Sequence, residues 1–128
     1  MEKIVDPKDV AMHFHDCINN ADIEGLSELM TDDHIFIDIV NTKIEGKSNV
    51  ISIAWTPFFR FFSNYRNVIE KVSVKNKTVI MHGYSVCSDE RLNNLHVVWV
   101  AEVVDNKVSL WNIYSDNEDN RNLLDVFE

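Results

Sequence analysis

The sequence predicts one α+β domain, residues 1–128, in which N-terminal helices pack on the concave face of a strongly curved antiparallel sheet. Two observations support this prediction. Apolar residues recur at helical spacing through the first half of the chain, whereas strand-like runs fill the second half. Those runs approach about ten residues, and such long strands in a small domain must twist and bend.

The composition narrows the possible partners and compartment. Apolar residues make up 45% of the chain, so it can bury a core, and the formal net charge of −9 argues against nucleic acid or an anionic membrane surface. Cys17 and Cys87 have no motif spacing and predict reduced, buried thiols. No signal peptide or run of roughly 20 apolar residues is visible, so a cytoplasmic protein without a membrane segment is expected.

Two short helices are expected first. Asp6 and Pro7 are typical of a helix start, and the helix over about 7–20 presents apolar residues at helical spacing: Val10, Phe14, Cys17 and Ile18. Asp22 can cap a second helix, which Thr31-Asp32-Asp33 ends and whose inward residues are Leu26, Leu29 and Met30.

A strand and a third helix follow. Residues 34–39 alternate, with Phe36 and Asp38 on one side of the predicted strand, and 43–45 form a short return. Ser48 can cap a helix over about 49–62, and Pro57 must kink it or begin a new helical segment.

Four long strands close the domain. They are predicted over 66–75, 78–88, 95–104 and 107–115, with turns at Asn76-Lys77 and Asp105-Asn106. The tail after Asp116 is expected to form a short acidic helix through Leu123, Leu124 and Phe127.

Several short motifs resemble the SnoaL-like branch of the nuclear transport factor 2-like superfamily. They keep the order and spacing of that family along nearly the whole chain: Asn19 to Asp22, Leu29 to Asp38, Glu45-Gly46-Lys47, Asp105 to Val108, and Tyr114-Ser115-Asp116. The resemblance implies a cone-shaped domain whose bent sheet and helices surround an apolar cavity, often in a homodimer. Its members include isomerases, cyclases, epoxide hydrolases and binding modules without chemistry, so it identifies a fold more than a reaction.

Asp38 is the first candidate for chemistry. The resemblance places it where a ketosteroid isomerase has its proton-transferring Asp, and apolar neighbours would make a carboxylate a better base. The alternative is an Asp that hydrogen-bonds the turn at Asn41-Thr42. The isomerase's oxyanion donors correspond to Phe14 and Trp99, which lack the same donor groups, so steroid isomerisation is not expected. The Asp-Arg-Asp set of the epoxide hydrolases is not visible either.

Further residues are candidates for the cavity wall. Alternation puts Asn112, Tyr114 and Asp116 on one face of the last strand, and the resemblance implies that this face lines the cavity; the alternative for Asp116 is a helix cap. Aromatic residues on the third helix are core or cavity wall, and they favour a flat apolar ligand: Trp55, Phe58, Phe59 and Phe62.

The histidines offer candidate proton carriers but no metal site. His82 and His96 lie on neighbouring predicted strands, either imidazole could carry a proton near neutral pH, and His82 is the stronger candidate for a role in the pocket. His34 reads as a surface residue at a strand entry, and His13 and His15 point to different sides of a helix. No cluster has metal spacing, so neither a metal nor another cofactor is expected.

The outer face of the sheet is expected to be apolar, with Val98, Val100, Trp111 and Ile113 exposed on it. Such a face must be covered, and a second copy of the chain is the simplest cover. Two functions therefore remain: a small enzyme that uses Asp38 on a small apolar compound without a cofactor, or a non-catalytic homodimeric module that binds a ligand or a partner.

Overall fold

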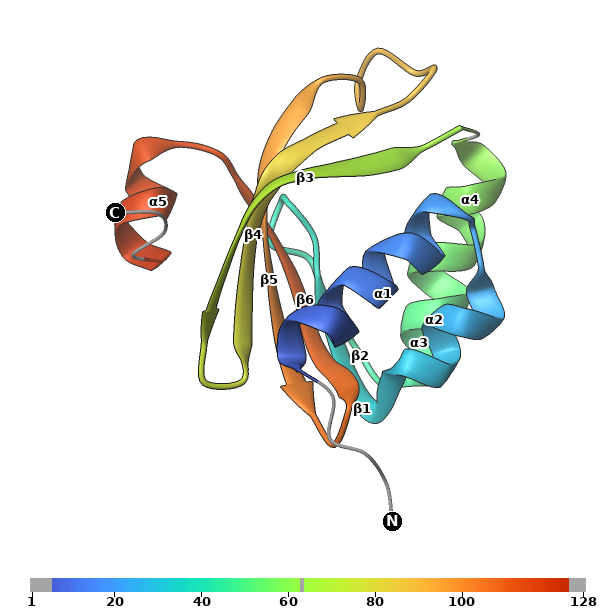
Figure 1. Ribbon diagram of the computed structural model, residues 1–128. Helices are drawn as coiled ribbons and strands as arrows, with labels where there is room; N and C mark the ends of the chain where they lie inside the picture. The colour runs from blue at the N-terminus through green and yellow to red at the C-terminus, as the bar shows by residue number, and fades with distance from the viewer. Residues whose placement is uncertain (1–5, 63, 125–128) are drawn as a thin grey trace.

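The fold was analysed in a computed structural model that describes residues 6–62 and 64–124. Within the described residues, six helical segments and six strands follow one another in an α+β order. Figure 1 shows α1 to α4 gathered against the inner face of one bent sheet, while α5 lies on the opposite side. The predicted fold class is therefore confirmed.

The first two helices begin where the sequence predicts. Helix α1 spans Pro7–Asn19, and the Asp6 carboxylate accepts a hydrogen bond from the Lys8 N–H. Helix α2 spans Ile23–Leu29, with the Asp22 side chain bound to the Gly25 N–H. The inclusion of Met30 in α2 is wrong, because Met30 is already extended and begins the first strand.

The third helical region has three parts: α3 (Lys47–Asn49), the π-helix η1 (Val50–Trp55) and α4 (Thr56–Phe61). Gly46, with φ +92°, occupies the cap position, so the prediction that Ser48 caps this region is wrong. Pro57 lies in the first turn of α4, which confirms that a new helical segment begins there.

One six-stranded sheet forms the other layer, in the order β2-β1-β6-β5-β4-β3. The sheet is mixed, because β1 runs parallel to β6 whereas every other pair is antiparallel. This corrects the expectation of a wholly antiparallel sheet. The strand bounds are β1 (Met30–Ile37), β2 (Lys43–Glu45), β3 (Arg66–Lys75), β4 (Thr78–Val86), β5 (Leu95–Val104) and β6 (Lys107–Ser115).

The register of β6 decides which side chains reach the core. At the hairpin turn Val103 pairs with Val108, but a bulge follows, and beyond it Trp99 pairs with Ile113 and Val98 with Tyr114. One extra residue in a strand exchanges its two faces. Residues 111 and 113 therefore face the helices. Alternation counted from the turn without a bulge predicted that 112 and 114 would face them instead.

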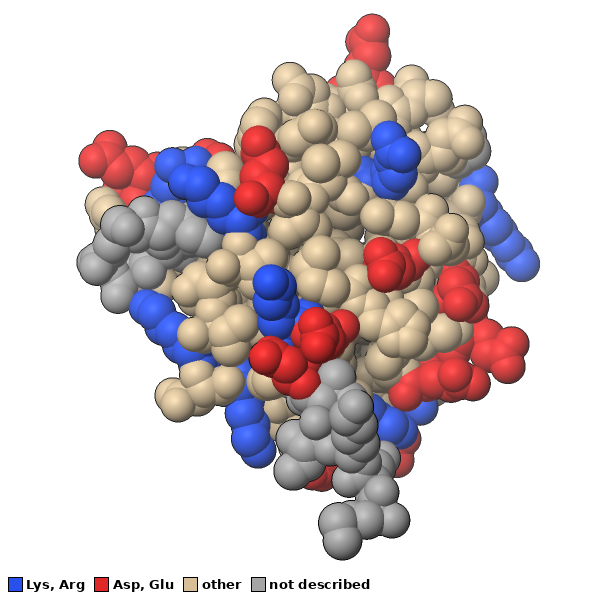
Figure 2. Space-filling view, viewed as in Figure 1, with Lys and Arg blue, Asp and Glu red and all other residues tan. Residues whose placement is uncertain are grey.

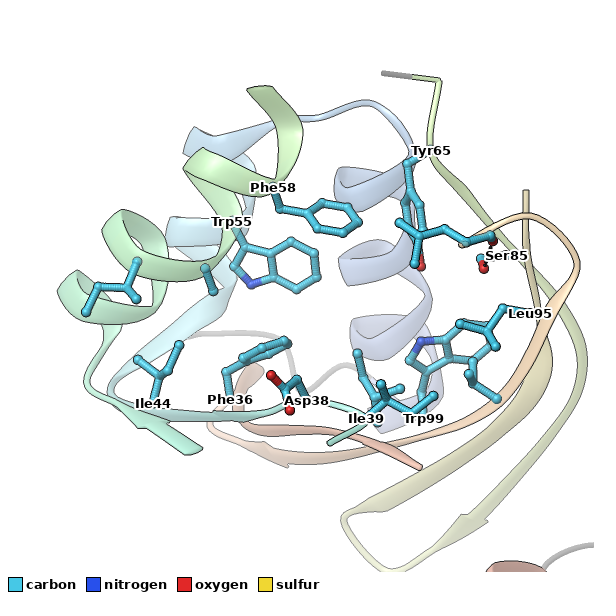
Figure 3. A pocket seen from close by; sticks show the side chains of 15 residues that line it. Phe36, Asp38, Ile39, Ile44, Trp55, Phe58, Tyr65, Ser85, Leu95 and Trp99 are labelled. Carbon is cyan, nitrogen blue, oxygen red and sulfur yellow. Dashed lines mark hydrogen bonds between the residues drawn. The ribbon is translucent and has the colours of Figure 1, made fainter. Parts of the chain in front are cut away.

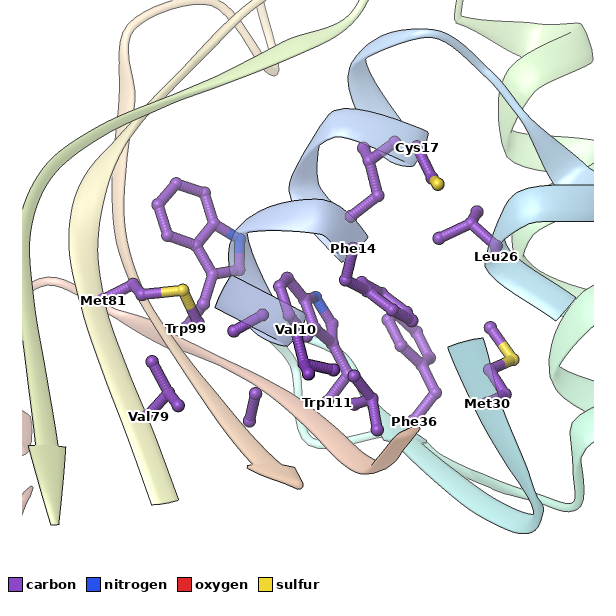
Figure 4. Close-up of a cluster of buried hydrophobic side chains, with 14 of the residues drawn as sticks. Val10, Phe14, Cys17, Leu26, Met30, Phe36, Val79, Met81, Trp99 and Trp111 are labelled. Carbon is purple, nitrogen blue, oxygen red and sulfur yellow. The ribbon is translucent and has the colours of Figure 1, made fainter. Parts of the chain in front are cut away.

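The main core lies between α1 and the inner face of the sheet (Figure 4). Phe14 is fully buried and stacks on Trp111 with ring centroids 4.4 Å apart. Cys17 and Cys87 are both buried, as predicted.

A second, smaller apolar cluster lies on the outer face of the sheet. It consists of Ile80, Val98 and Val100, with Tyr114 and Leu124 packed against it. The outward orientation of Val98 and Val100 is confirmed, but that of Trp111 and Ile113 is wrong, because both belong to the inner core. Helix α5 (Glu118–Leu124) supplies Leu124, so the tail helix of this same chain covers part of the face. The predicted contributions of Phe127 and of the Leu123 side chain lie outside the described residues.

Two surface properties complete the description. Acidic and basic side chains are interspersed over the face shown in Figure 2. Among the described residues, no helix has the length and apolar character needed to cross a membrane.

Candidate functional site

An apolar cavity of about 340 Å³ lies between the inner face of the sheet and the helical segments η1 and α4. Three of its lining side chains are polar: Asp38, Tyr65 and Ser85. The others are apolar: Phe36, Ile39, Ile44, Ile53, Ala54, Trp55, Phe58, Leu92, Leu95, Val97, Trp99 and Ile113. Figure 3 shows these side chains converging from both layers on one space.

Aromatic rings form opposite walls of the cavity. Trp55 contacts Phe36 and Phe58, with ring centroids 5.4 and 5.9 Å away. Trp99, on β5, lies on the other side of the space (Figure 3). The sequence predicted a cavity role for Trp55 and Trp99, and both line it.

Asp38 follows directly after β1 and is half-buried at the cavity wall. Its Oδ1 accepts hydrogen bonds from the N–H groups of Val40 (3.0 Å) and Thr42 (2.8 Å). The alternative that Asp38 binds the following turn is thus confirmed. Both bonds use Oδ1, and Oδ2 accepts none from the described residues, so the carboxylate can serve the turn and the cavity at once.

Tyr65 and Ser85 are the polar groups that sequence reasoning missed. Burial raises the pKa of Tyr65 to about 12, against the opposing effect of its hydrogen bond with Ser85. The Ser85 hydroxyl donates to the Leu92 carbonyl. The phenol of Tyr65 is therefore protonated at neutral pH, and because the single Ser85 proton goes to Leu92, the Tyr65 hydroxyl is the donor in its bond with Ser85. Only an aromatic residue directly before a strand hinted at this position.

Two predicted ligand-binding residues belong to the core behind the cavity. Phe14 stacks on Trp111, and Phe59 stacks on Trp55 at 5.6 Å. Neither lines the cavity wall.

Four predicted site residues lie away from the cavity, on the outer face: His82, Asn112, Tyr114 and Asp116. The expectation that this face of β6 lines the cavity is wrong. The bulge near the hairpin adds one residue to β6, so the side chains beyond it point to the opposite face of the sheet. His82 pairs with Val98, whose side chain belongs to the outer cluster. Asn112 donates instead to the Tyr114 hydroxyl, 2.8 Å away.

Asp116 connects β6 to α5 rather than capping that helix. Its carboxylate accepts two hydrogen bonds from Arg121, at 2.5 and 2.9 Å, and lies 2.7 Å from Nε2 of His82. The hydrogen bond from Arg121 is the main cause that holds the pKa of Asp116 below its usual value. The capping role falls to Asn117, whose side chain accepts from the Asn120 N–H.

Two other histidines are sealed in the core. The prediction that His34 lies on the surface is wrong: it is fully buried, and its Nδ1 lies 2.7 Å from the Val108 carbonyl oxygen. Burial lowers the pKa of His34 and lowers that of His15 to about 3. Neither lines the cavity, so both are structural residues.

The SnoaL-like domain family matches residues 11–111. No curated protein matches the sequence.

Solved structures share the fold at low identity. An LEH-like epoxide hydrolase of M. tuberculosis is 17% identical, with a TM-score of 0.74 over 86% of this chain and 82% of that one. A nuclear transport factor 2-like protein of unknown function from Cytophaga hutchinsonii is 11% identical, with a TM-score of 0.72 over 97% and 99%. TerC, co-crystallised with polyporic acid, is 15% identical, with a TM-score of 0.71 over 93% and 98%.

Proposed function

The chain belongs to the SnoaL-like domain family, as its motifs predicted, and we propose that its cavity binds a compact, flat, apolar molecule on which Asp38 acts as an acid–base group. The observation that carries this proposal is the cavity itself, which combines aromatic walls with one carboxylate and one phenol. The ligand class follows from the wall, and the chemistry follows from the two polar side chains.

The cavity favours a small ring compound. Its volume of about 340 Å³ lies near the lower end of ligand pockets, which span about 300–1,000 Å³. Aromatic walls favour flat ligands through stacked and edge contacts, and few polar groups are present to hold a sugar or a nucleotide. TerC, which shares the fold, was co-crystallised with polyporic acid, in keeping with a small-molecule ligand.

Asp38 and Tyr65 suit proton transfer next to a carbonyl group. They lie on opposite sides of the cavity in Figure 3. The carboxylate of Asp38 would take a proton from the carbon beside the carbonyl. The Tyr65 hydroxyl would exchange its hydrogen bond to Ser85 for one to the carbonyl oxygen as negative charge develops there. Asp38 would then return the proton to the same carbon or to another. Tyr65 thereby supplies a donor that Phe14 cannot.

The epoxide hydrolase pattern has less support. Of the fifteen side chains that line the cavity, Asp38 is the only charged one, and no guanidinium group is among them. The Asp-Arg-Asp set of that chemistry would need two further charged partners there.

A non-catalytic ligand-binding or association module is the alternative. It is favoured by the two hydrogen bonds between Asp38 and the backbone of the turn, which give the carboxylate a structural role. In that case the ligand would bind with the same preference for flat apolar compounds, but it would not be turned over.

Binding is tested with 2-tetralone, a flat bicyclic ketone, by isothermal titration calorimetry. Ala54→Phe fills the cavity and should weaken binding by at least about tenfold, since an added ring competes for the same volume. Val104→Phe makes a similar change at an exposed position and should leave binding intact. Equal affinity in both variants would place the ligand elsewhere.

The chemistry is tested by deuterium exchange at the carbons beside the carbonyl of 2-tetralone, followed by NMR. Asp38→Asn keeps an oxygen acceptor for the turn but removes the base, so exchange should fall to the uncatalysed rate while binding and folding persist. Asp38→Ala should also destabilise the turn. Binding without exchange in the wild type would favour the non-catalytic module.

A further inference from the structure

Three potential metal ligands from neighbouring strands meet on the outer face of the sheet. Glu70 on β3, His82 on β4 and His96 on β5 each bring one ligand atom within 4.8 Å of the other two. Sequence spacing does not reveal this group, since the three residues belong to three different strands. We propose that this triad binds a zinc ion, at a site separate from the cavity and independent of its function.

Strand register brings the two histidines together. His82 pairs with Val98 and Tyr84 pairs with His96, so the histidines are diagonal neighbours on one face of an antiparallel pair. Their ring centroids lie 6.4 Å apart. This placement is fixed by the backbone hydrogen bonds of two long strands rather than by a loop.

A β-bulge adds the carboxylate. Ile69 pairs with Gly83 and Lys71 pairs with His82, so Glu70 is the extra residue of the bulge. Gly83 makes this possible, because a Cβ atom there would lie 1.9 Å from the Val68 carbonyl oxygen. Bulges often redirect a side chain beside a functional site, and here the bulge turns Glu70 towards the histidines.

Asp116 binds and orients His82, as a carboxylate beside a metal site commonly orients a histidine that binds the metal. Its Oδ2 lies 2.7 Å from Nε2 of His82, and Arg121 binds the same carboxylate. Metal-bound histidines usually donate their other ring N–H to a carboxylate. Because a carboxylate oxygen accepts, the Asp116 bond places the proton on Nε2 and so fixes the tautomer of His82.

Arg121 does not compete with this arrangement. Its Nη2 lies 3.2 Å from Nε2 of His82 and 2.9 Å from Oδ2 of Asp116. Because a protonated Nε2 cannot accept a hydrogen bond, Arg121 donates to the carboxylate instead, and its charge is balanced there.

Two imidazoles and one carboxylate are a zinc ligand set. Zinc is bound by three such ligands and one water in tetrahedral sites, with bonds of about 2.0–2.2 Å. Ligand atoms would then lie about 3.3–3.6 Å apart, so the triad needs to close by at most roughly 1.5 Å. Glu70 and His96 are exposed and can adjust their rotamers to do so. Magnesium and calcium prefer oxygen ligands and fit less well.

The test is zinc binding to the full chain after treatment with a chelator and dialysis. Isothermal titration calorimetry with zinc chloride should show saturable binding of one zinc per chain. Cobalt(II), used as a spectroscopic substitute, should give the strong visible absorption of a tetrahedral site. Glu70→Gln and His96→Gln alter exposed residues and should each weaken zinc binding by at least about tenfold.

Matched controls separate this site from nonspecific binding. His13→Gln and Glu102→Gln change exposed residues of the same types outside the triad and should leave zinc affinity unchanged. Asp116→Asn should weaken binding less than loss of a ligand does, through the orientation of His82, with circular dichroism as the check on folding. Absence of saturable binding, or affinity unchanged in both Glu70→Gln and His96→Gln, would overturn the proposal.

Discussion

Two histidines sealed in the core are held neutral by their surroundings. His15 is 1% exposed, and its Nδ1 lies 3.1 Å from the amide nitrogen of Asn67, which donates to it. Its other nitrogen lies 3.2 Å from the sulfur of Met81. Protonation would place a charge among Trp99 and Trp111, whose rings meet the imidazole edge-on.

The first prediction concerns stability against acid. The pKa of His15 falls to about 3 in the folded state, whereas an unfolded histidine titrates near 6.5. The stability that depends on neutral His15 is therefore fully present above pH 6.5 and is lost as the pH falls below that value. The unfolding free energy should fall by about 2–3 kcal/mol between pH 7 and pH 4.5. His34 adds to the loss in the same direction, since burial lowers its pKa too.

Urea unfolding at a series of pH values checks this. His15→Gln should be less stable than the wild type at pH 7 but should lose less stability on acidification. His13→Gln, on the exposed side of the same helix, should keep the wild-type profile. If the unfolding free energy of His15→Gln fell with pH as steeply as that of the wild type, the His15 imidazole would not be the cause of the acid sensitivity.

At the level of elements, the sequence predicted the strands well and their faces poorly. The bounds of β5 and β6 agree with the prediction, because alternation and the Asp105-Asn106 turn are local signals. The bulges are not local signals, since they depend on pairing with another strand. One bulge put Asn112 and Tyr114 on the outer face and Ile113 in the cavity, and another brought Glu70 to His82.

The second prediction concerns the bulge in β3. Gly83→Ala would force a Cβ atom against the Val68 carbonyl, which belongs to backbone and cannot move without the strand. We expect a loss of about 1–3 kcal/mol in unfolding free energy, measured by urea unfolding. The same variant should lose zinc affinity, because Glu70 depends on that bulge. An Ala variant as stable as the wild type would contradict the close approach of the strands.

Across the whole molecule, the two faces of the sheet have different partners. The inner face holds the core and the cavity, and the outer cluster is partly covered by Leu124 of α5. The argument for a homodimer was an exposed apolar outer face, and that face is smaller than expected. Trp111 and Ile113 belong to the inner core, and Val98 and Val100 are already buried within one chain. If a homodimer forms there, a second copy must compete with α5.

The third prediction tests this competition. Leu124→Asp puts a charge against an apolar cluster and should release α5, lowering the unfolding free energy by about 1–2 kcal/mol. The uncovered face should then increase self-association, measured by analytical ultracentrifugation. Asn122→Asp makes an acidic change at an exposed position of the same helix and should have no such effect. Equal association of both variants would argue against an interface at this face.

The candidate site was only partly predictable from the sequence. Asp38, Trp55 and Trp99 line the cavity. The family resemblance had marked Asp38 and Trp99, and the aromatic cluster of the third helix had marked Trp55. Tyr65 and Ser85 carried no motif and are brought there by the pairing of β3 with β4 and by the loop before β3. A cavity wall is a tertiary property, so the residues without a local signal were missed.

The most direct test of the cavity is methyl NMR of isotopically labelled isoleucine during a titration with 2-tetralone. The methyl signals of Ile39, Ile44 and Ile113, which line the cavity, should shift in a saturable way. The signal of Ile80, in the outer cluster, should stay in place. Saturable shifts at Ile80 alone, or no saturable shift at any cavity isoleucine, would contradict a ligand-binding pocket in this domain.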